Sequence, residues 1–368
     1  MGNITSSSDN RHAGSPAAGQ SDTRHAIAQS YRRLIVRRLT IVAVLSVICV
    51  VAFLLDLVTG PSSLTASQVL SELWSRGTLS MPQSTIVWEL RLPQAAMAFL
   101  VGAALSLAGA EMQTILNNPL ASPFTLGVSS AASFGAALAI ILGVSIPFVS
   151  ADWMIPLNAF LCAFGSVLLL EMISRRRAAG PNTVVLFGIA LVFTFNALVA
   201  FIQFVSSQEA LQQLVFWSMG SLGRSTWISV SAMLVVLLAL LPFSMRAALS
   251  MTVLRMGEDK ARSFGINVAR LRFMSLMRIS LLAGTAVAFV GTIGFIGLVG
   301  PHIARLLLGE DHRFLLPASA LTGGLVMSLS SMLSKSLVPG VLLPVGIVTS
   351  VVGVPIFVFL IFRRQQRV

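Results

Sequence analysis

Long apolar stretches separated by short basic segments restrict the fold of this chain more than any other feature of its sequence. They cover roughly residues 39–59, 90–113, 124–149, 154–173, 183–206, 228–245, 274–298, 315–334 and 343–362. A helix needs about 20 apolar residues to cross the hydrocarbon core of a bilayer, and most of these stretches are about that long. Only 10% of the residues are charged, whereas soluble domains carry roughly a quarter. We therefore expect an all-α polytopic membrane protein.

Two further segments complete this expected topology. Gly300 and Pro301 should open a helix that ends at 311–313. At about ten residues it is too short to cross alone, so it should be a half-length element buried in protein. The mixed stretch 207–227 is typical of an amphipathic helix with interfacial tryptophans at the outer face. Counting the short helix, we expect about ten transmembrane helices in a compact bundle.

The basic residues indicate the orientation of the chain. They cluster at 32–38, 175–177, 246–272 and 363–367, and an even number of spans separates each cluster from the next. The positive-inside rule therefore places all four clusters, and both termini, in the cytoplasm. This placement also accounts for the net charge of +12, so we expect membrane lipid around the chain and no nucleic-acid partner.

The first residues differ in composition from the rest of the chain. Residues 1–35 are rich in Ser, Asn, Gly, Arg and His and contain few apolar side chains. This composition predicts a disordered, basic cytoplasmic tail. Residues 36–368 then form one transmembrane domain.

Motifs for catalysis or metal binding are absent from the sequence. The only Lys-Ser pair, Lys335–Ser336, lacks the glycines of a phosphate-binding loop, so the chain should not hydrolyse ATP. His302 and His312 have no third ligand near them in the sequence. We expect no catalytic residue, no metal site and no cofactor.

Acidic residues inside the spans are few. Asp56, Glu111 and Glu171 lie near the predicted ends of apolar stretches, where capping or an interfacial position explains them. A carrier driven by protons or sodium usually keeps ionisable groups near the middle of the membrane. The sequence shows no such set.

The basic segment at 254–267 has an unusual pattern for a loop between two spans. It predicts a short charged helix, a stop at Gly265 and a second short helix. A solvated loop is one interpretation. The other is a docking surface that seats in a groove of a partner and passes the partner's motion to the bundle.

Three groups of motifs resemble a known family. They are Arg91-Leu92-Pro93 with 101–110, 118–123 and 126–128; Met256-Gly257-Glu258 with Phe264-Gly265; and 294–305 with 311–313 and 343–349. In this order they resemble the FecCD-type permease subunits of the iron-siderophore, haem and vitamin B12 importers, which are type II ABC importers. The resemblance extends from about residue 85 to the C-terminus.

The resemblance implies a transport function and a set of partners. It implies that residues 36–368 form a permease domain in the bacterial inner membrane, paired with a second copy or a sister permease. Two ATPase subunits would dock beneath, and a periplasmic or lipoprotein substrate-binding protein would dock above. The cargo would be an iron-siderophore chelate, with haem or a corrinoid as the alternative. Rivals of other classes are a proton-coupled secondary carrier and a non-transporting membrane scaffold.

The resemblance also implies roles for particular residues. Those that match the segment coupled to the ATPase are Gly257, Glu258, Ala261, Arg262 and Gly265. Asn118 and Leu120 match the cytoplasmic gate, and Arg91 and Lys335 match positions that hold the binding protein. The sequence departs from the family pattern at Gln94, Asn117, Ser331 and Leu342. The outer face therefore offers fewer charged contacts to a binding protein.

Overall fold

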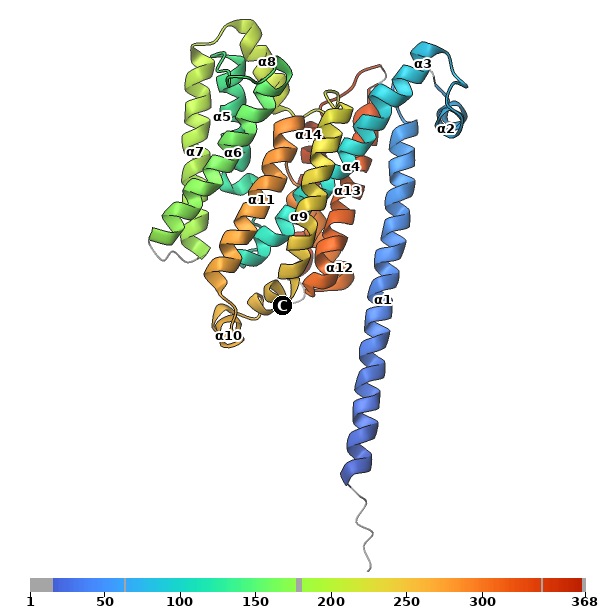
Figure 1. The fold of residues 1–368 in the computed structure, drawn as a ribbon, viewed down its shortest axis with the longest axis vertical. Coiled ribbons are helices and arrows are strands. Elements are labelled where there is room, and N and C mark those ends of the chain that lie inside the picture. The colour runs from blue at the N-terminus through green and yellow to red at the C-terminus, as the bar shows by residue number, and fades with distance from the viewer. Residues whose placement is uncertain (1–15, 63, 177–180, 339, 366–368) are drawn as a thin grey trace, which may run out of the picture.

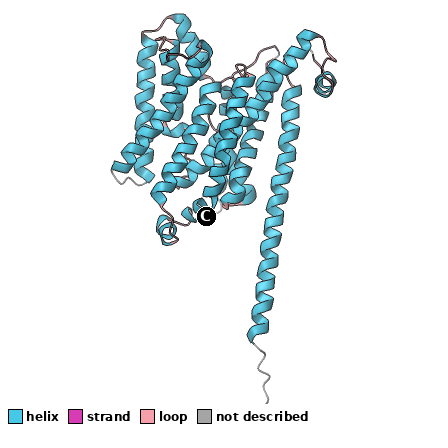
Figure 2. Ribbon diagram, viewed as in Figure 1, coloured by secondary structure: helices cyan, strands magenta, loops and turns pink. Residues whose placement is uncertain are grey.

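The computed structural model describes residues 16–62, 64–176, 181–338 and 340–365. These residues form helices joined by loops, and no strand occurs among them (Figure 2). The longer helices are α1 (Pro16–Val58), α4 (Leu92–Ile115), α5 (Val128–Ile140), α6 (Ala151–Arg176), α7 (Pro181–Phe204), α9 (Trp227–Leu254), α11 (Val268–Val290), α12 (Ile296–Leu308), α13 (His312–Ser336) and α14 (Val345–Gln365). The shorter elements are α2 (Ala66–Trp74), α3 (Met81–Thr85), the π-helical turn η1 (Ile86–Arg91), η2 (Phe124–Leu126), α8 (Gln208–Ser218) and α10 (Glu258–Ser263).

The helices confirm the expected polytopic bundle. Among the described residues, seven helical segments are long and apolar enough to cross a membrane, and three shorter apolar helices, α5, α12 and α14, accompany them. Two boundaries differ from the prediction. The third apolar stretch contains a helix of only 13 residues, α5. The half-length helix α12 begins at Ile296, so Pro301 lies inside it.

The position of Pro301 inside α12 has a simple structural explanation. Proline has no N–H, so the carbonyl of Gly297, four residues earlier, loses its partner within the helix. The side chain of Gln113 on α4 donates to this carbonyl at 3.5 Å. The neighbouring helix thus replaces the missing hydrogen bond, as a broken helix inside a membrane bundle requires.

Helix α4 is the centre of the bundle and packs against α9, α11, α12 and α13. Small residues allow this close packing. A Cβ atom added to Gly102 would lie 2.4 Å from the carbonyl oxygen of Gly323 on α13, and one added to Gly109 would lie 2.0 Å from that of Gly297 on α12. Backbone contacts this close exclude any larger side chain, and they set the crossings of α4 with both neighbours.

Helix α1 lies at the edge of the bundle and packs chiefly against α13 (Figure 1). It begins at Pro16, so residues 16–35, which we expected to be disordered, continue the helix of the first span. The physical reason is that helix formation propagates easily from an existing helix into residues such as Ala, Gln and Arg. Residues 1–15, and the side chains at 175–177 and 363–367, lie outside the described residues, so the domain boundary at residue 36 stays a prediction.

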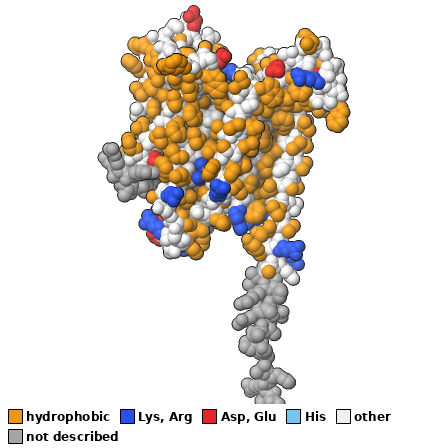
Figure 3. All heavy atoms as spheres, viewed as in Figure 1, with side chains coloured by type: hydrophobic (Ala, Val, Ile, Leu, Met, Phe, Trp, Pro, Cys, Tyr) orange, Lys and Arg blue, Asp and Glu red, His pale blue; other side chains and the backbone are white. Residues whose placement is uncertain are grey.

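The two ends of the bundle carry different side chains. We call the end with α10 and the last turn of α4 the α10 end, and the end with α2, α3 and α8 the α3 end (Figure 1). Between them the surface is largely apolar, and lysine and arginine side chains gather toward the α10 end (Figure 3). Helix α8 at the α3 end confirms the amphipathic helix expected after residue 207.

Candidate coupling site and gate

The segment predicted to couple to an ATPase forms a protruding helical turn at the α10 end. Glycines in left-handed conformations bound it, with φ of 116° at Gly257 and 77° at Gly265. Only residues without a Cβ adopt such angles at little cost. Ala261 is buried in a small apolar cluster with residues of α9 and α11, which attaches the turn to the bundle. The turn is therefore held in place by its apolar side.

The outward side of this turn is available for contact. Gly257, Arg262 and Gly265 are exposed. Phe264 is 70% exposed and Met256 is 58% exposed, although both are large apolar residues. Two such side chains on one tip, rimmed by charged residues, are typical of a protein–protein contact.

Glu258 connects this turn to the end of α4. Its carboxylate forms an ion pair with Arg272 of α11, and it also contacts Arg262 at 3.4 Å. Arg272 in turn donates through Nε to the carbonyl oxygen of Ile115 at 3.1 Å. Ile115 is the last residue of α4, where carbonyl groups lack partners within the helix. One arginine thus joins the coupling turn to the central helix.

The predicted gate residues lie in the loop that follows α4. The Asn118 Oδ1 atom accepts a hydrogen bond from the Leu120 backbone N–H at 2.9 Å, which closes a tight turn. Leu120 is 48% exposed at the α10 end. Asn117, which precedes them, has a φ of 47°, a conformation that asparagine tolerates better than most residues. The structure therefore places the predicted gate beside the predicted coupling turn.

Arg255, at the end of α9, holds this loop from a second direction. It donates to the Asn117 Oδ1 atom at 2.8 Å and to Glu310 Oε1 at 3.0 Å. Glu310 also pairs with Arg305 of α12 at 3.0 Å. Burial alone would raise the pKa of Glu310, but the charges of Arg305 and Arg255 outweigh it and lower this pKa below its usual value. The carboxylate therefore stays charged and keeps both arginines in place.

His312 is the buried polar centre of the same end. The Thr114 hydroxyl lies 2.7 Å from its Nε2 atom, and the Thr252 hydroxyl lies 3.2 Å from its Nδ1 atom. These contacts join α13 to α4 and α9. Both ring nitrogens are therefore engaged by hydroxyl groups.

Arg91 and Lys335 do not form the exposed contacts that we expected for a binding protein. They are only 4% and 6% exposed. The Lys335 Nζ atom forms an ion pair with Asp56 of α1 at 2.8 Å. Arg91 donates to the Val58 carbonyl at 2.7 Å and to the Ser62 hydroxyl at 2.6 Å. The reason is that α1 and the residues after it cover both cations, which the sequence of α4 and α13 alone could not reveal.

Sequence reasoning also missed the partners of the buried carboxylates. Asp56 and Glu111 are fully buried, and each forms an ion pair with a cation on another helix. Glu111 on α4 pairs with Arg278 on α11 at 2.7 Å. The sequence did contain an indication of these partners. Arg278 and Lys335 are basic residues in or next to apolar stretches, and such residues need a partner. Arg255 and Arg272 carried no comparable signal, since they stand among other basic residues.

The family of the chain follows from a comparison of its sequence with known proteins. The sequence model of the FecCD transport family matches residues 48–363. The chain belongs to this family. It is therefore the permease subunit of an ABC importer and a multi-pass protein of the inner membrane. Its partners are an ATPase subunit, a substrate-binding protein and a second permease subunit.

Relatives of the chain differ in the cargo that their names state. It is 35% identical over 285 residues to the hemin transport system permease protein HmuU of Yersinia pestis, with 76% of this chain and 84% of the relative covered. It is 36% identical over 280 residues to the Fe(3+) dicitrate transport system permease protein FecD of Escherichia coli (76% and 86% covered). It is 35% identical over 300 residues to the vitamin B12 import system permease protein BtuC of Vibrio cholerae (81% and 89% covered).

A solved structure shares the fold. It is described as an inward-facing metal-chelate type ABC transporter, with a TM-score of 0.78 and 30% identity, and the match covers 88% of this chain and 99% of the other.

Proposed function

We propose that this permease moves an iron-siderophore type chelate into the cytoplasm, driven by a separate ATPase subunit that docks on the α10 end. The observation that carries the proposal is the contact from Glu258 through Arg272 to the last carbonyl of α4. A push on the coupling turn is passed directly to the helix whose following loop holds Asn118 and Leu120. With the α10 end on the cytoplasmic side, both termini and the predicted gate also face the cytoplasm.

The cargo assignment is supported by the ferric dicitrate relative and by the motifs shared with the siderophore importers. Haem and corrinoids remain the alternative cargoes, because the relatives from Yersinia pestis and Vibrio cholerae are named for them. A proton-coupled carrier is disfavoured. The two fully buried span carboxylates, Asp56 and Glu111, are paired with Lys335 and Arg278, so neither is a free proton carrier.

The proposal is tested by reconstituting the permease with its ATPase and binding protein in liposomes. We expect uptake of a radioiron-labelled ferric siderophore that requires ATP and continues when the proton gradient is collapsed. Haemin, ferric citrate and cobalamin, added as unlabelled competitors, identify the cargo. Uptake that stops when the proton gradient is collapsed and does not depend on ATP would contradict the proposed energy source. Competition by haemin alone, or by cobalamin alone, would reassign the cargo.

The coupling route is tested with Arg272→Gln. This change keeps the side chain polar and similar in size but removes the ion pair with Glu258. We expect ATP hydrolysis to continue while uptake per ATP falls roughly tenfold, because the turn then loses its ion-paired connection to α4. Arg270→Gln, on an exposed position two residues away on the same helix, is the matched control and should keep normal coupling. Equal coupling in both variants would contradict the route.

A further inference from the structure

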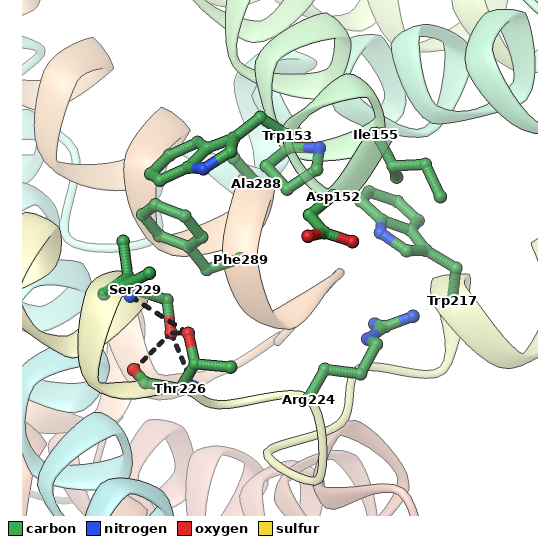
Figure 4. A pocket seen from close by; sticks show the side chains of 11 residues that line it. Asp152, Trp153, Ile155, Trp217, Arg224, Thr226, Ser229, Ala288 and Phe289 are labelled. Atoms are coloured by element: carbon green, nitrogen blue, oxygen red, sulfur yellow. Dashed lines mark hydrogen bonds between the residues drawn. The ribbon is translucent and has the colours of Figure 1, made fainter. Parts of the chain in front are cut away.

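A cavity of about 350 Å³ opens at the α3 end, away from the coupling site and the gate. The first turns of α6 and α9 and the last turn of α11 form its walls, and the loop 219–226 passes beside it (Figure 4). All three helices are candidate spans whose ends lie here. Tryptophans 153 and 217 line it, and Trp227 lies next to it in the chain. Span ends surrounded by tryptophans mark the headgroup region of a bilayer.

The cavity is lined by one cation and one anion. The side chains of Arg224 and Asp152 both project into it (Figure 4). Both residues are exposed. Within the described part of the chain, neither forms an ion pair or a side-chain hydrogen bond. A ligand with an anionic and a cationic group would satisfy both, because ionised groups form the strongest hydrogen bonds.

Most of the remaining wall is apolar, apart from Thr226 and Ser229, and it continues onto the membrane-facing surface. Trp153 and Phe289 pack edge to face, with ring centroids 5.6 Å apart. Ile228 lines the cavity and is 64% exposed. It shares one face of α9 with Val235 and Leu238, which are 64% and 57% exposed. This face of α9 provides an apolar track that leads from the charged groups toward the middle of the bilayer.

We propose that this cavity binds the headgroup of an aminophospholipid such as phosphatidylethanolamine. Arg224 holds the phosphate, Asp152 accepts hydrogen bonds from the primary ammonium group, and an acyl chain lies along the Ile228 face of α9. The volume of about 350 Å³ suits a small headgroup. A soluble chelate would not use the apolar track, which is the reason for choosing a lipid. The proposal stands independently of the cargo and of the coupling route.

A bound headgroup would also stabilise the loop 219–226. Ser221 in this loop donates to the Val290 carbonyl at 2.7 Å, at the end of α11. A Cβ atom added to Gly291 would lie 3.4 Å from the Arg224 guanidinium, so this cation sits directly against the break between α11 and α12. The lipid would therefore fix the loop against the end of α11.

The test is lipid binding to the full chain in detergent, measured by native mass spectrometry. The probes are phosphatidylethanolamine, phosphatidylcholine, phosphatidylglycerol and the chain-free headgroup glycerophosphoethanolamine. We expect the wild type to retain phosphatidylethanolamine best, because the trimethylated choline group has no N–H to donate to Asp152. Arg224→Gln should weaken binding of phosphatidylethanolamine and phosphatidylglycerol roughly tenfold. Asp152→Asn should remove only the preference over phosphatidylcholine.

Arg246→Gln is the matched control, because Arg246 lies on α9 at the opposite end of the span and is exposed. It should bind phosphatidylethanolamine like the wild type, and unchanged thermal unfolding of each variant shows that the fold is intact. Equal retention of all three lipids, or no effect of Arg224→Gln, would overturn the proposal. Tight binding of the chain-free headgroup, or displacement of the lipid by ferric citrate, would instead identify a site for a soluble ligand.

Discussion

At the α10 end, arginines from α9, α11 and α12 hold the last turn of α4 and the loop after it. At the α3 end, Arg91 and Lys335 hold α1 and the residues that follow it. The first set is partly exposed, whereas the second is almost completely buried. Both ends therefore use cations to join separate helices, but in different surroundings.

The difference in burial affects how easily the ion pairs at each end can separate. A partly exposed ion pair is weak, because water solvates its charges when the pair opens. A buried pair is costly to separate, since each charge would lose its partner in a medium that cannot replace it. The α10 end can therefore rearrange its contacts at little cost, while the contacts between α1 and the bundle stay fixed. This arrangement suits a permease that receives motion at one end.

Breaking the buried pair at the α3 end should have the largest effect. Asp56→Ala leaves the Lys335 ammonium buried without its partner, and we expect a loss of about 3–5 kcal/mol of stability. Thermal or denaturant unfolding in detergent measures it. The double variant Asp56→Leu with Lys335→Met should recover most of the loss, because it removes both charges. A single-variant cost below about 1 kcal/mol would mean that water or another group compensates the lysine.

The ion pair at the α10 end should affect transport more than stability. Glu258→Gln, Arg272→Gln and the double variant form a mutant cycle. We expect each to cost about 1 kcal/mol or less in unfolding free energy, because the pair is partly exposed, while uptake per ATP falls roughly tenfold. The double variant should be no worse than either single one. Additive losses would show that the two residues act through separate contacts.

Arg255→Lys should loosen the loop at 116–123, which holds the predicted gate residues, while leaving α9 intact. Arg255 reaches Asn117 and Glu310 with two different nitrogens, and lysine has only one. We expect a loss of about 1 kcal/mol in local stability, measured as faster amide exchange in residues 116–123. Exchange in α10 is the internal control and should not change. Unchanged exchange in the loop would show that Asn117 is held by its own backbone turn.

The smallest expected effect is a pH dependence of local stability in α2, α3 and the residues between them. Hydrogen bonds from Ser84 and from neighbouring groups at 77–79 lower the pKa of Glu72 to about 2. Because this pKa is below its ordinary value of 4.5, the carboxylate stabilises the folded segment above pH 4.5, and this contribution is lost as the pH falls toward 2. Amide exchange of residues 76–84 should rise in that window. Glu72→Gln should abolish the pH dependence while the α10 end stays unaffected.

Local sequence patterns predicted much of the fold and part of the candidate site. Apolar length predicted the spans, and Gly265 predicted the end of the short charged helix before it, because each is a property of a few consecutive residues. Asn118 and Leu120 came from the family resemblance, and their role as a gate stays a prediction. The helical continuation of α1 back to Pro16 and the start of α12 at Ile296 were missed, because helix boundaries depend on neighbouring helices.

The sequence by itself determined a helical membrane bundle and the short helix that ends at Gly265. Only the tertiary structure decided which charges meet. Asp56 and Lys335 are 279 residues apart in the chain, and Glu111 and Arg278 are 167 apart. The first pair joins α1 to α13 and the second joins α4 to α11, so each contact depends on how those two helices cross. A membrane span can be predicted from the length of a run of consecutive apolar residues, whereas an ion pair between helices depends on the distance and angle at which the helices cross.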